Sequence, residues 1–330
     1  MKKKILFKAP VLTRSGYGEQ SRFALRALMD RQDLFDIYVQ PLQWGQTSWI
    51  NDNSIDRGWL DGTIEKTIAY IQQGGQFDIS FQVTIPNEWE QLAPVNIGYT
   101  AGIETNKVAH QWLTKGNEMD KIVVVSNHAK RVFEETAYMG VDQNTQQQVK
   151  LQLTTPVTTV NYPAKKFDDL PDLDIDFKND INFLVVAQFG PRKNLINTLK
   201  WFIEEFHDDE VGMILKTNLA KNCLLDRANV QNQLKEFVAN YPDRKCSVYL
   251  LHGDMEDEEM HSLYSHKKVS ALVSLAHGEG FGLPIFEAAY TGLPVVCTGW
   301  SGQLDFLVDE EGKERFYNIA FDMKHIPDEV

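Results

Sequence analysis

Residues 277–296 combine four glycines and two glutamates in an order that suits a phosphate-containing ligand. Their sequence, HGEGFGLPIFEAAYTGLPVV, follows the apolar run Ala271–Leu275, which predicts a buried strand. Gly278, Gly280 and Gly282 allow a backbone to approach a ligand closely. The proline that follows suits the first turn of a helix, where its missing N–H costs nothing. The free N–H groups at that helix start predict an anion site suited to a phosphate.

Two carboxylates flank this anion site, Glu279 in the loop and Glu287 about one turn into the helix. Carboxylates accept hydrogen bonds from hydroxyls, which both a sugar and a ribose offer. A phosphate site beside carboxylates therefore suits a sugar nucleotide. Glycine-rich turns alone are common in α/β proteins, so the specific signal is the pair of glutamates eight residues apart. The alternative is an ordinary helix start with a surface Glu279 and a helix-face Glu287.

The run resembles the E-x7-E signature of the retaining glycosyltransferases of family 4, which have the GT-B fold. The resemblance implies an α/β architecture with two Rossmann-like domains facing across a cleft. It also implies that Glu279 holds sugar hydroxyls and Glu287 holds the ribose. The intervening donor-binding residues would be Gly280, Phe281, Gly282 and Leu283.

Short apolar runs alternate with longer amphipathic ones along the first half, which favours a parallel sheet with crossover helices. Residues 142–150 are polar and predict a loop. The predicted strands are Lys4–Phe7, Asp36–Val39, Asp78–Phe81, Asn96–Tyr99, Lys121–Val125 and Val157–Tyr162. The predicted helices are Gly18–Met29, Gly62–Gln73, Lys107–Lys115 and Asn127–Ala137.

The second half repeats this alternation after a linker. Residues 163–178 contain two prolines and a cluster of aspartates, so we set the domains at 1–162 and 181–330, with a linker over 163–180. The predicted strands are Asn182–Ala187, Val211–Lys216, Ser247–Leu251, Ala271–Leu275 and Pro294–Cys297. The predicted helices are Asn194–Phe206, Leu224–Val238, Asp257–Ser265 and Leu283–Thr291.

The loop after the first predicted strand opens the first helix with Gly16-Tyr17-Gly18. It resembles the glycine-rich N-terminal loop of family-4 transferases, which approaches the donor phosphate and sugar. The backbone N–H groups of Gly16 and Gly18 could bind an oxygen, and Arg14 could add charge. The alternative, a plain strand-to-helix turn, is equally consistent with Arg14.

The first strand of the second domain leads into Arg192 and Lys193, two cations at a helix start capped by Asn194. Cations beside free N–H groups suit a diphosphate. The resembled family commonly carries an arginine soon after this strand and a lysine a few residues on, both in contact with the diphosphate. Gln188 stands near where that arginine is often found. A surface Arg-Lys pair is the alternative.

Two further strand ends offer donor contacts. Lys216 ends a predicted strand, and the carboxyl ends of parallel strands point toward the ligand edge. Gly253 follows the next strand, in a loop that lies beside the nucleotide base in the resembled family. The acidic run 256–259 is better explained as a helix start with favourable dipole placement.

Glu104 and His110 lie in GIETNKVAHQW, which resembles the family's stretch facing the donor sugar and the acceptor. His110 could bind a hydroxyl or a phosphate, although a lone histidine on a helix is usually structural. Ser126 and Asn127 resemble the family's next helix start, and a simple N-cap explains them as well.

Composition limits the class of protein. The net charge is −13, of which −1 falls in residues 1–160 and −12 in residues 161–330. The acidic second half argues against a broad nucleic-acid surface there. No apolar run approaches the roughly 20 residues that span a bilayer. The three cysteines show neither metal spacing nor a disulfide framework, so a reducing cytoplasm is the simplest setting.

The D-x-D matches at 172–174 and 174–176 lie in the linker, and the resembled fold does not rely on that motif, so we predict no essential metal and no cofactor. The predicted activity is retaining transfer of a hexose or pentose from a nucleotide sugar, UDP- or GDP-linked. The acceptor stays open among glycan, lipid-linked sugar, protein and modified DNA base. Two alternatives are a non-catalytic sugar-binding relative and a sugar-nucleotide epimerase or phosphorylase. Residues 318–330 are short and polar, so we expect no C-terminal return helix, either through its absence or through truncation.

Overall fold

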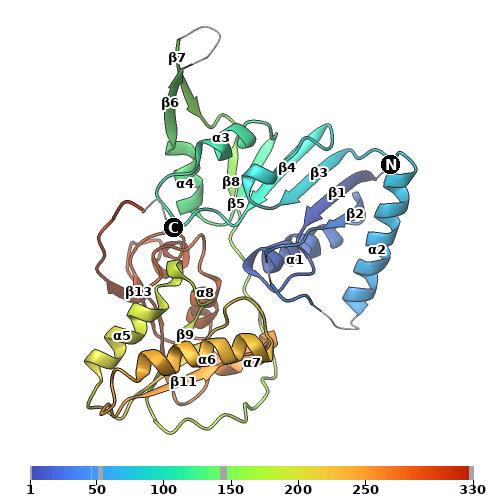
Figure 1. Ribbon diagram of the computed structural model, residues 1–330. Helices are drawn as coiled ribbons and strands as arrows, with labels where there is room; N and C mark the ends of the chain where they lie inside the picture. The colour runs from blue at the N-terminus through green and yellow to red at the C-terminus, as the bar shows by residue number, and fades with distance from the viewer. Residues whose placement is uncertain (1, 46, 51–54, 142–146, 327–330) are drawn as a thin grey trace. The chain divides into compact units, whose positions relative to one another are not determined.

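The computed structural model describes residues 2–45, 47–50, 55–141 and 147–326. The chain divides into two compact units, Met1–Pro163 and Ala164–Val330. Each unit is built around its own six-stranded parallel sheet (Figure 1). Among the described residues, no helix is both long enough and apolar enough to cross a bilayer.

The sheet of the first unit has the order β2-β1-β3-β4-β5-β8, and all of its strand pairs are parallel. Its strands are β1 Lys3–Ala9, β2 Phe35–Pro41, β3 Ile79–Val83, β4 Val95–Thr100, β5 Lys121–Val124 and β8 Val157–Thr159. The helices of this unit are α1 Gly16–Met29, α2 Ile55–Gln72, the 3-10 turn η1 Pro86–Glu88, α3 His110–Gly116 and α4 Asn127–Glu135.

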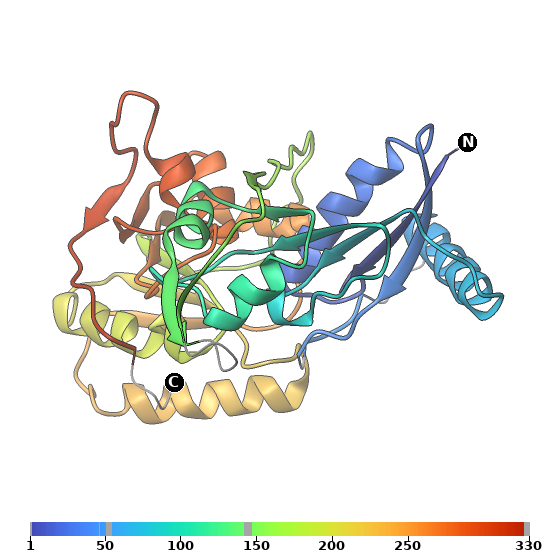
Figure 2. The same cartoon turned by 90° about the horizontal axis from the view of Figure 1, so that it is seen from above.

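Continuous apolar runs explain why this sheet is internal. Ile5, Leu6 and Phe7 of β1 are all buried although successive side chains point to opposite faces, so both faces of this strand are covered. Helix α2 lies beside the edge strand β2 (Figure 2). Helix α4 begins at a serine N-cap, because the Ser126 hydroxyl accepts the Ala129 N–H at 3.1 Å.

A β-hairpin that the sequence did not predict follows α4. Strands β6 Ala137–Val141 and β7 Gln148–Gln152 pair antiparallel and project from the unit (Figure 1). The predicted helix to Ala137 is therefore too long, and residues 148–150 of the predicted loop are strand, while 142–146 lie outside the described residues. The hairpin base is held because Tyr138 and Leu151 pack on the buried cluster around Trp89. That long-range packing overrides the polar composition.

The sheet of the second unit has the order β11-β10-β9-β12-β13-β14, again with all pairs parallel. This is the 3-2-1-4-5-6 order of the doubly wound fold. Its strands are β9 Asn182–Val186, β10 Gly212–Lys216, β11 Ser247–Leu251, β12 Val269–Ser274, β13 Val295–Thr298 and β14 Tyr317–Ile319. Its helices are the 3-10 turn η2 Pro191–Lys193, α5 Leu195–Glu205, α6 Leu224–Val238, α7 Asp257–Tyr264, α8 Leu283–Tyr290 and α9 Leu304–Leu307.

Alternate side chains of the central strands enter two different cores. Leu184 of β9 and Ile214 of β10 belong to a cluster with residues of α7 and α8. Val185 and Leu215, one position later on each strand, belong to a cluster with residues of α5 and α6. Helices therefore cover both faces, which is why these strands read as unbroken apolar runs. Residues 320–326 form no helix, and the last residues of the predicted polar tail, 327–330, lie outside the described residues.

Candidate active site

The strand order of the second unit reverses at β9, which has β10 on one side and β12 on the other. In such sheets ligands bind outside the carboxyl ends of the strands at this switch point. The connection after β9 carries Arg192 and Lys193 on the turn η2, and the connection after β12 carries Glu279. The fold therefore brings together three predicted site residues that are up to 87 positions apart in the sequence.

Two cations converge on the Glu279 carboxylate. Lys193 Nζ forms an ion pair with Glu279 Oε1, and Arg192 NH1 lies 3.4 Å from Glu279 Oε2. Arg192 NH1 also donates to the Gly278 carbonyl at 2.9 Å. The Lys193 and Glu279 side chains are only 17% and 10% exposed. A carboxylate this buried requires compensating charge, and the same group of atoms can bind an anion and a hydroxyl side by side.

Backbone contacts fix the cation loop against the glycine loop. The His277 N–H donates to the Arg192 carbonyl at 2.9 Å. Asn194 was predicted to cap the following helix through its side chain, but it adopts a left-handed conformation with φ 54° and makes no such cap. Its side-chain amide donates instead to the Leu275 carbonyl at 3.1 Å. Asn194 thus joins the ends of β9 and β12, which the sequence does not show to be neighbours.

The glycine loop is held from its other side by residues after β13 that the sequence reasoning missed. The Glu279 N–H donates to Ser301 Oγ at 3.0 Å, and the Gly302 N–H donates to the Glu279 carbonyl at 2.9 Å. Trp300 Nε1 donates to the His277 carbonyl at 3.0 Å. The sequence could have indicated residues 300–302 only by their position, because they follow β13, the strand that pairs with β12.

The start of α8 follows the glycine loop directly. Gly282 precedes the helix with φ 89°, a left-handed conformation that favours glycine, and Leu283 is the first helical residue. The Phe281 side chain is buried against Phe286 and Phe306, with ring centroids 5.3 and 5.0 Å away. The Phe281 ring therefore anchors the loop in the core.

Glu287 has a buried partner that was not predicted. Its Oε2 accepts a hydrogen bond from the Tyr264 hydroxyl at 3.0 Å. Burial raises the pKa of Tyr264 well above its ordinary value, and the Glu287 charge raises it further. Tyr264 therefore stays protonated and donates, which fixes the direction of the Glu287 carboxylate.

Lys216 and Gly253 meet at the carboxyl ends of β10 and β11. Lys216 Nζ donates to the Gly253 carbonyl. Burial lowers the pKa of Lys216, and the charge of Asp254 opposes that shift. Gly253 has φ 123°, and no heavy atom lies within 4 Å of where its side chain would begin. The predicted pair thus lies on the ligand edge of the sheet.

Gln188, which stands near the position of the arginine often found in the resembled family, has a structural contact. Its Nε2 donates to the Leu219 carbonyl at 2.6 Å, so it joins the connections that follow β9 and β10. The positive charge near η2 therefore comes from Arg192 and Lys193.

In the first unit, the predicted glycine loop is a capped helix start. The Gly18 N–H donates to Ser15 Oγ at 3.0 Å, which is the N-cap contact of α1. A Cβ atom on Gly18 would lie 2.0 Å from the Thr13 carbonyl oxygen, so packing requires glycine here. No heavy atom lies within 4 Å of the corresponding position on Gly16. The Arg14 N–H donates to the Ser48 carbonyl at 2.8 Å.

Tyr17, which lies between those two glycines, was not predicted as a site residue. Its hydroxyl is 2.7 Å from Thr100 Oγ1, at the carboxyl end of β4. Its ring centroid lies 4.3 Å from that of Trp44. Burial raises the pKa of Tyr17, with a smaller contribution from the charge of Glu104. Tyr17 thus links the loop after β1 to the end of β4.

Glu104 and His110 lie along the segment that leads from β4 to α3. His110 is exposed at the first position of α3, with its ring centroid 6.1 Å from that of Tyr138. The segment is held by His128 Nε2, which lies 3.2 Å from the Thr105 carbonyl oxygen. Glu104 and His110 both follow the carboxyl end of β4, and α/β sheets bind ligands at that edge.

The described residues contain no cluster of three or more histidine, cysteine, aspartate or glutamate side chains suited to a metal ion. In the D-x-D segment, Asp176 lies 3.3 Å from Lys268 Nζ. Burial and the charge of Glu279 raise the pKa of the Cys297 thiol to about 12, so this cysteine stays protonated and is a poor nucleophile.

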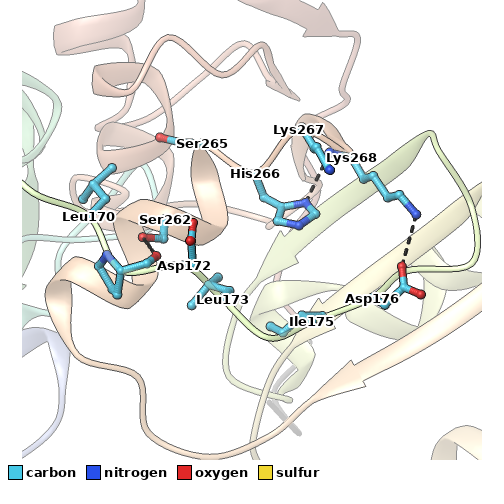
Figure 3. A pocket seen from close by; sticks show the side chains of 11 residues that line it. Leu170, Asp172, Leu173, Ile175, Asp176, Ser262, Ser265, His266, Lys267 and Lys268 are labelled. Carbon is cyan, nitrogen blue, oxygen red and sulfur yellow. Dashed lines mark hydrogen bonds and ion pairs between the residues drawn. The ribbon is translucent and has the colours of Figure 1, made fainter.

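A hollow of about 520 Å³ lies elsewhere in the second unit, between residues 170–176 and 262–268 (Figure 3). Lys268 points toward Asp176 across it, and Ser262 Oγ donates to the Pro171 carbonyl at 2.7 Å. These polar groups satisfy one another. The hollow borders the residues that precede β12, so it lies at the amino edge of the sheet rather than at the ligand edge.

Comparison with known proteins agrees with this geometry. Residues 174–318 match the family described as glycosyl transferases group 1. The structure is similar to OtsA in its apo form, with a TM-score of 0.57 and 10% identity over 96% of this chain and 88% of that one. It is also similar to sucrose-phosphate synthase from Thermosynechococcus elongatus, with a TM-score of 0.57 and 14% identity over 94% and 84% of the two chains.

A glycosyltransferase from Rickettsia africae is similar at a TM-score of 0.51 and 15% identity, over 92% of this chain and 81% of that one. No curated protein matches the sequence. The topology of the two units and these likenesses show the GT-B fold, built from two Rossmann-like domains. The group 1 match over residues 174–318 identifies the second domain as a glycosyltransferase domain.

Proposed function

We propose that the protein moves a sugar from a nucleoside-diphosphate sugar to an acceptor hydroxyl with retention of configuration. The observation that carries this proposal is the convergence of Lys193 and Arg192 on Glu279 at the switch point of the second domain. The cations suit the two phosphates, and the carboxylate suits the sugar hydroxyls. Glu287, in the second turn of α8, would hold the ribose.

The proposed reaction breaks the bond between the anomeric carbon and the diphosphate oxygen. The acceptor oxygen forms its bond to the same carbon on the same face, and its proton passes to the leaving diphosphate. No separate base is then required. Arg192, Lys193 and the N–H groups at the start of α8 would stabilise the charge that develops on the diphosphate, because preorganised donors cost no reorganisation during the step. Lys216, which donates to the Gly253 carbonyl, would serve the nucleotide from the end of β10.

The remaining proposed contacts come from backbone and from the first domain. Gly253, Gly280, Phe281, Gly282 and Leu283 would offer backbone groups to the nucleotide sugar. Arg14, Gly16 and Gly18 would serve the donor from the loop after β1, where the Gly18 N–H already caps α1. Glu104 and His110 would contact the sugar and the acceptor. This assignment is supported by their position after the carboxyl end of β4.

We propose a UDP- or GDP-linked donor, without a cofactor or an essential metal ion. The acceptor is a glycan, a lipid-linked sugar, a protein or a modified DNA base. The cytoplasm is the proposed location, because all three cysteines are unpaired, as in a reducing compartment.

A thermal-shift screen of nucleotide sugars tests the donor, since a ligand that binds only the folded state raises its stability. The donor that stabilises the protein is then incubated with acceptor candidates, and the anomeric configuration of the product is read by NMR. Retention supports the proposal, and an inverted product contradicts it. Binding without turnover on any acceptor would indicate a non-catalytic relative. Turnover of the donor without acceptor, to an epimer or to a sugar phosphate, would indicate an epimerase or a phosphorylase.

A further inference from the structure

A buried carboxylate–imidazole pair lies on the ligand edge of the second domain. His252 Nε2 donates to Asp226 Oδ1 at 2.8 Å. The two side chains are only 3% and 8% exposed. His252 directly follows β11, and Asp226 lies in the first turn of α6, which follows β10. The pair therefore joins the connections after two adjacent strands.

Asp226 also organises the backbone that precedes its own helix. Its carboxylate accepts the N–H groups of Leu219, Ala220 and Lys221 at 3.0, 2.8 and 2.9 Å. Burial opposes ionisation, but the hydrogen bonds from these N–H groups and from His252 outweigh it and lower the pKa of Asp226 to about 2. The carboxylate is therefore ionised at neutral pH, with four hydrogen-bond donors around it.

Other contacts make these connections into one continuous structure. The Thr217 N–H donates to the Leu251 carbonyl at 3.1 Å, and Asn222 donates to Asp254. The connection after β9 joins the same network, because the Phe189 N–H donates to the Asn218 carbonyl at 2.8 Å. The three consecutive strand ends β9, β10 and β11 are thus held together by hydrogen bonds.

Resting on the proposed function, we propose that Asp226 and His252 are positioning residues for nucleotide binding. They fix the backbone of residues 252–254, against which the base and ribose bind, while Arg192 and Lys193 take the diphosphate. Gly253 supports this assignment, because no heavy atom lies within 4 Å of the position that its Cβ would take, which leaves room for a ligand beside its backbone. Asp226 accepts hydrogen bonds from residues 219–221 and from His252, so the pair fixes two separate connections relative to each other.

Arg192 and Lys193 are held by contacts that do not involve this pair. Arg192 is held by the His277 N–H and by the Gly278 carbonyl, and Lys193 is held by Glu279. These contacts come from the connection after β12, on the other side of β9. A change at His252 should therefore weaken recognition of the nucleoside and spare recognition of the two phosphates.

The test compares His252→Leu with His252→Gln by calorimetric titration of UDP, GDP and inorganic pyrophosphate. We expect His252→Leu to bind the preferred nucleoside diphosphate about tenfold more weakly and pyrophosphate within about twofold of wild type. His252→Gln should recover most of the affinity, because its side-chain amide can donate to Asp226 in place of the ring Nε2. His207→Leu is the matched control, since His207 precedes β10 at the opposite edge and lies 3.2 Å from Asp208.

The outcomes separate this inference from the proposed function. Equal losses for the nucleoside diphosphate and for pyrophosphate, or no loss for either, would overturn the positioning role. If the wild-type protein binds neither UDP nor GDP, the proposed function is overturned, and this inference with it. If His252→Leu does not fold, as judged by circular dichroism, Asp226→Asn provides the same comparison at unchanged side-chain volume, with the same result expected.

Discussion

Removing the ammonium of Lys193 tests the proposed site most directly. In the structure this group is largely buried and paired with Glu279, and in the proposed reaction it acts on the leaving diphosphate. Losing one charge-assisted contact of this kind in a closed site costs about 3 kcal/mol of transition-state stabilisation, or about a hundredfold in rate. We therefore expect Lys193→Ala to slow turnover by about two orders of magnitude.

The same substitution has a smaller effect on folding. Removing one partner of a fully buried ion pair costs about 3–5 kcal/mol, but Glu279 keeps Arg192 NH1 at 3.4 Å. We expect the free energy of unfolding to fall by about 1–2 kcal/mol, well below the kinetic effect. Binding of the bare nucleoside should change little, because the ammonium acts on the phosphates.

The assay is single-turnover transfer with the donor that the thermal-shift screen selects, beside urea unfolding of each variant. Lys193→Arg should restore the rate only in part, since a planar guanidinium does not match a compact ammonium. Lys200→Ala is the control, because this α5 lysine is 47% exposed and lies 3.8 Å from Glu204. Wild-type rates in Lys193→Ala would refute the reasoning and would make Lys216 and Arg14 the next candidates.

Three further outcomes are expected. Glu287→Ala should weaken nucleotide binding and also destabilise the fold by about 1–3 kcal/mol, since it leaves the buried Tyr264 hydroxyl without this acceptor. Glu287→Gln should lose nucleotide affinity but keep most of the stability. Unchanged nucleotide affinity in both variants would exclude the ribose role. A chelator should leave transfer largely intact, because Arg192 and Lys193 supply the positive charge, and full loss that Mg²⁺ or Mn²⁺ restores would contradict this mechanism. The folded-state pKa of Asp226, about 2, lies below its ordinary value of 3.8, so its ionised form contributes stability that is complete above about pH 4 and is lost as the pH falls through 2. Asp226→Asn should accordingly lower the free energy of unfolding by about 2 kcal/mol at pH 7 and by much less near pH 2, and an equal loss at both pH values would contradict the sign of this linkage.

Several elements of the fold could be predicted from apolar periodicity. Ser247–Leu251 and Leu224–Val238 match their predicted bounds, because an apolar run and a helix with one buried face leave local signals. Other elements left weaker signals. The hairpin after α4 is stabilised by long-range packing, and β14 is a three-residue edge strand with exposed side chains. Such elements depend on neighbours that no local pattern reveals.

The candidate site was predictable in its residue types but not in its contacts. The spacing around Glu279 identified the glycine loop, and the strand ends identified Lys193 and Lys216. No pattern could show that Lys193 pairs with a residue 86 positions away, or that Asp226 and His252 share one hydrogen bond. Those contacts arise from the strand order 3-2-1-4-5-6, which places the ends of distant strands side by side.

The close packing of Gly302 against the glycine loop constrains how this protein can evolve. A Cβ atom at position 302 would lie 1.9 Å from the Gly280 carbonyl oxygen, and no side-chain rotamer can relieve an overlap between backbone atoms. In a saturation mutational scan, position 302 should therefore tolerate substitution as poorly as Glu279 and Glu287, although glycine has no side chain to offer to a reaction. A glycine loop transplanted from another protein should therefore be tolerated only together with the 299–303 segment of that same protein.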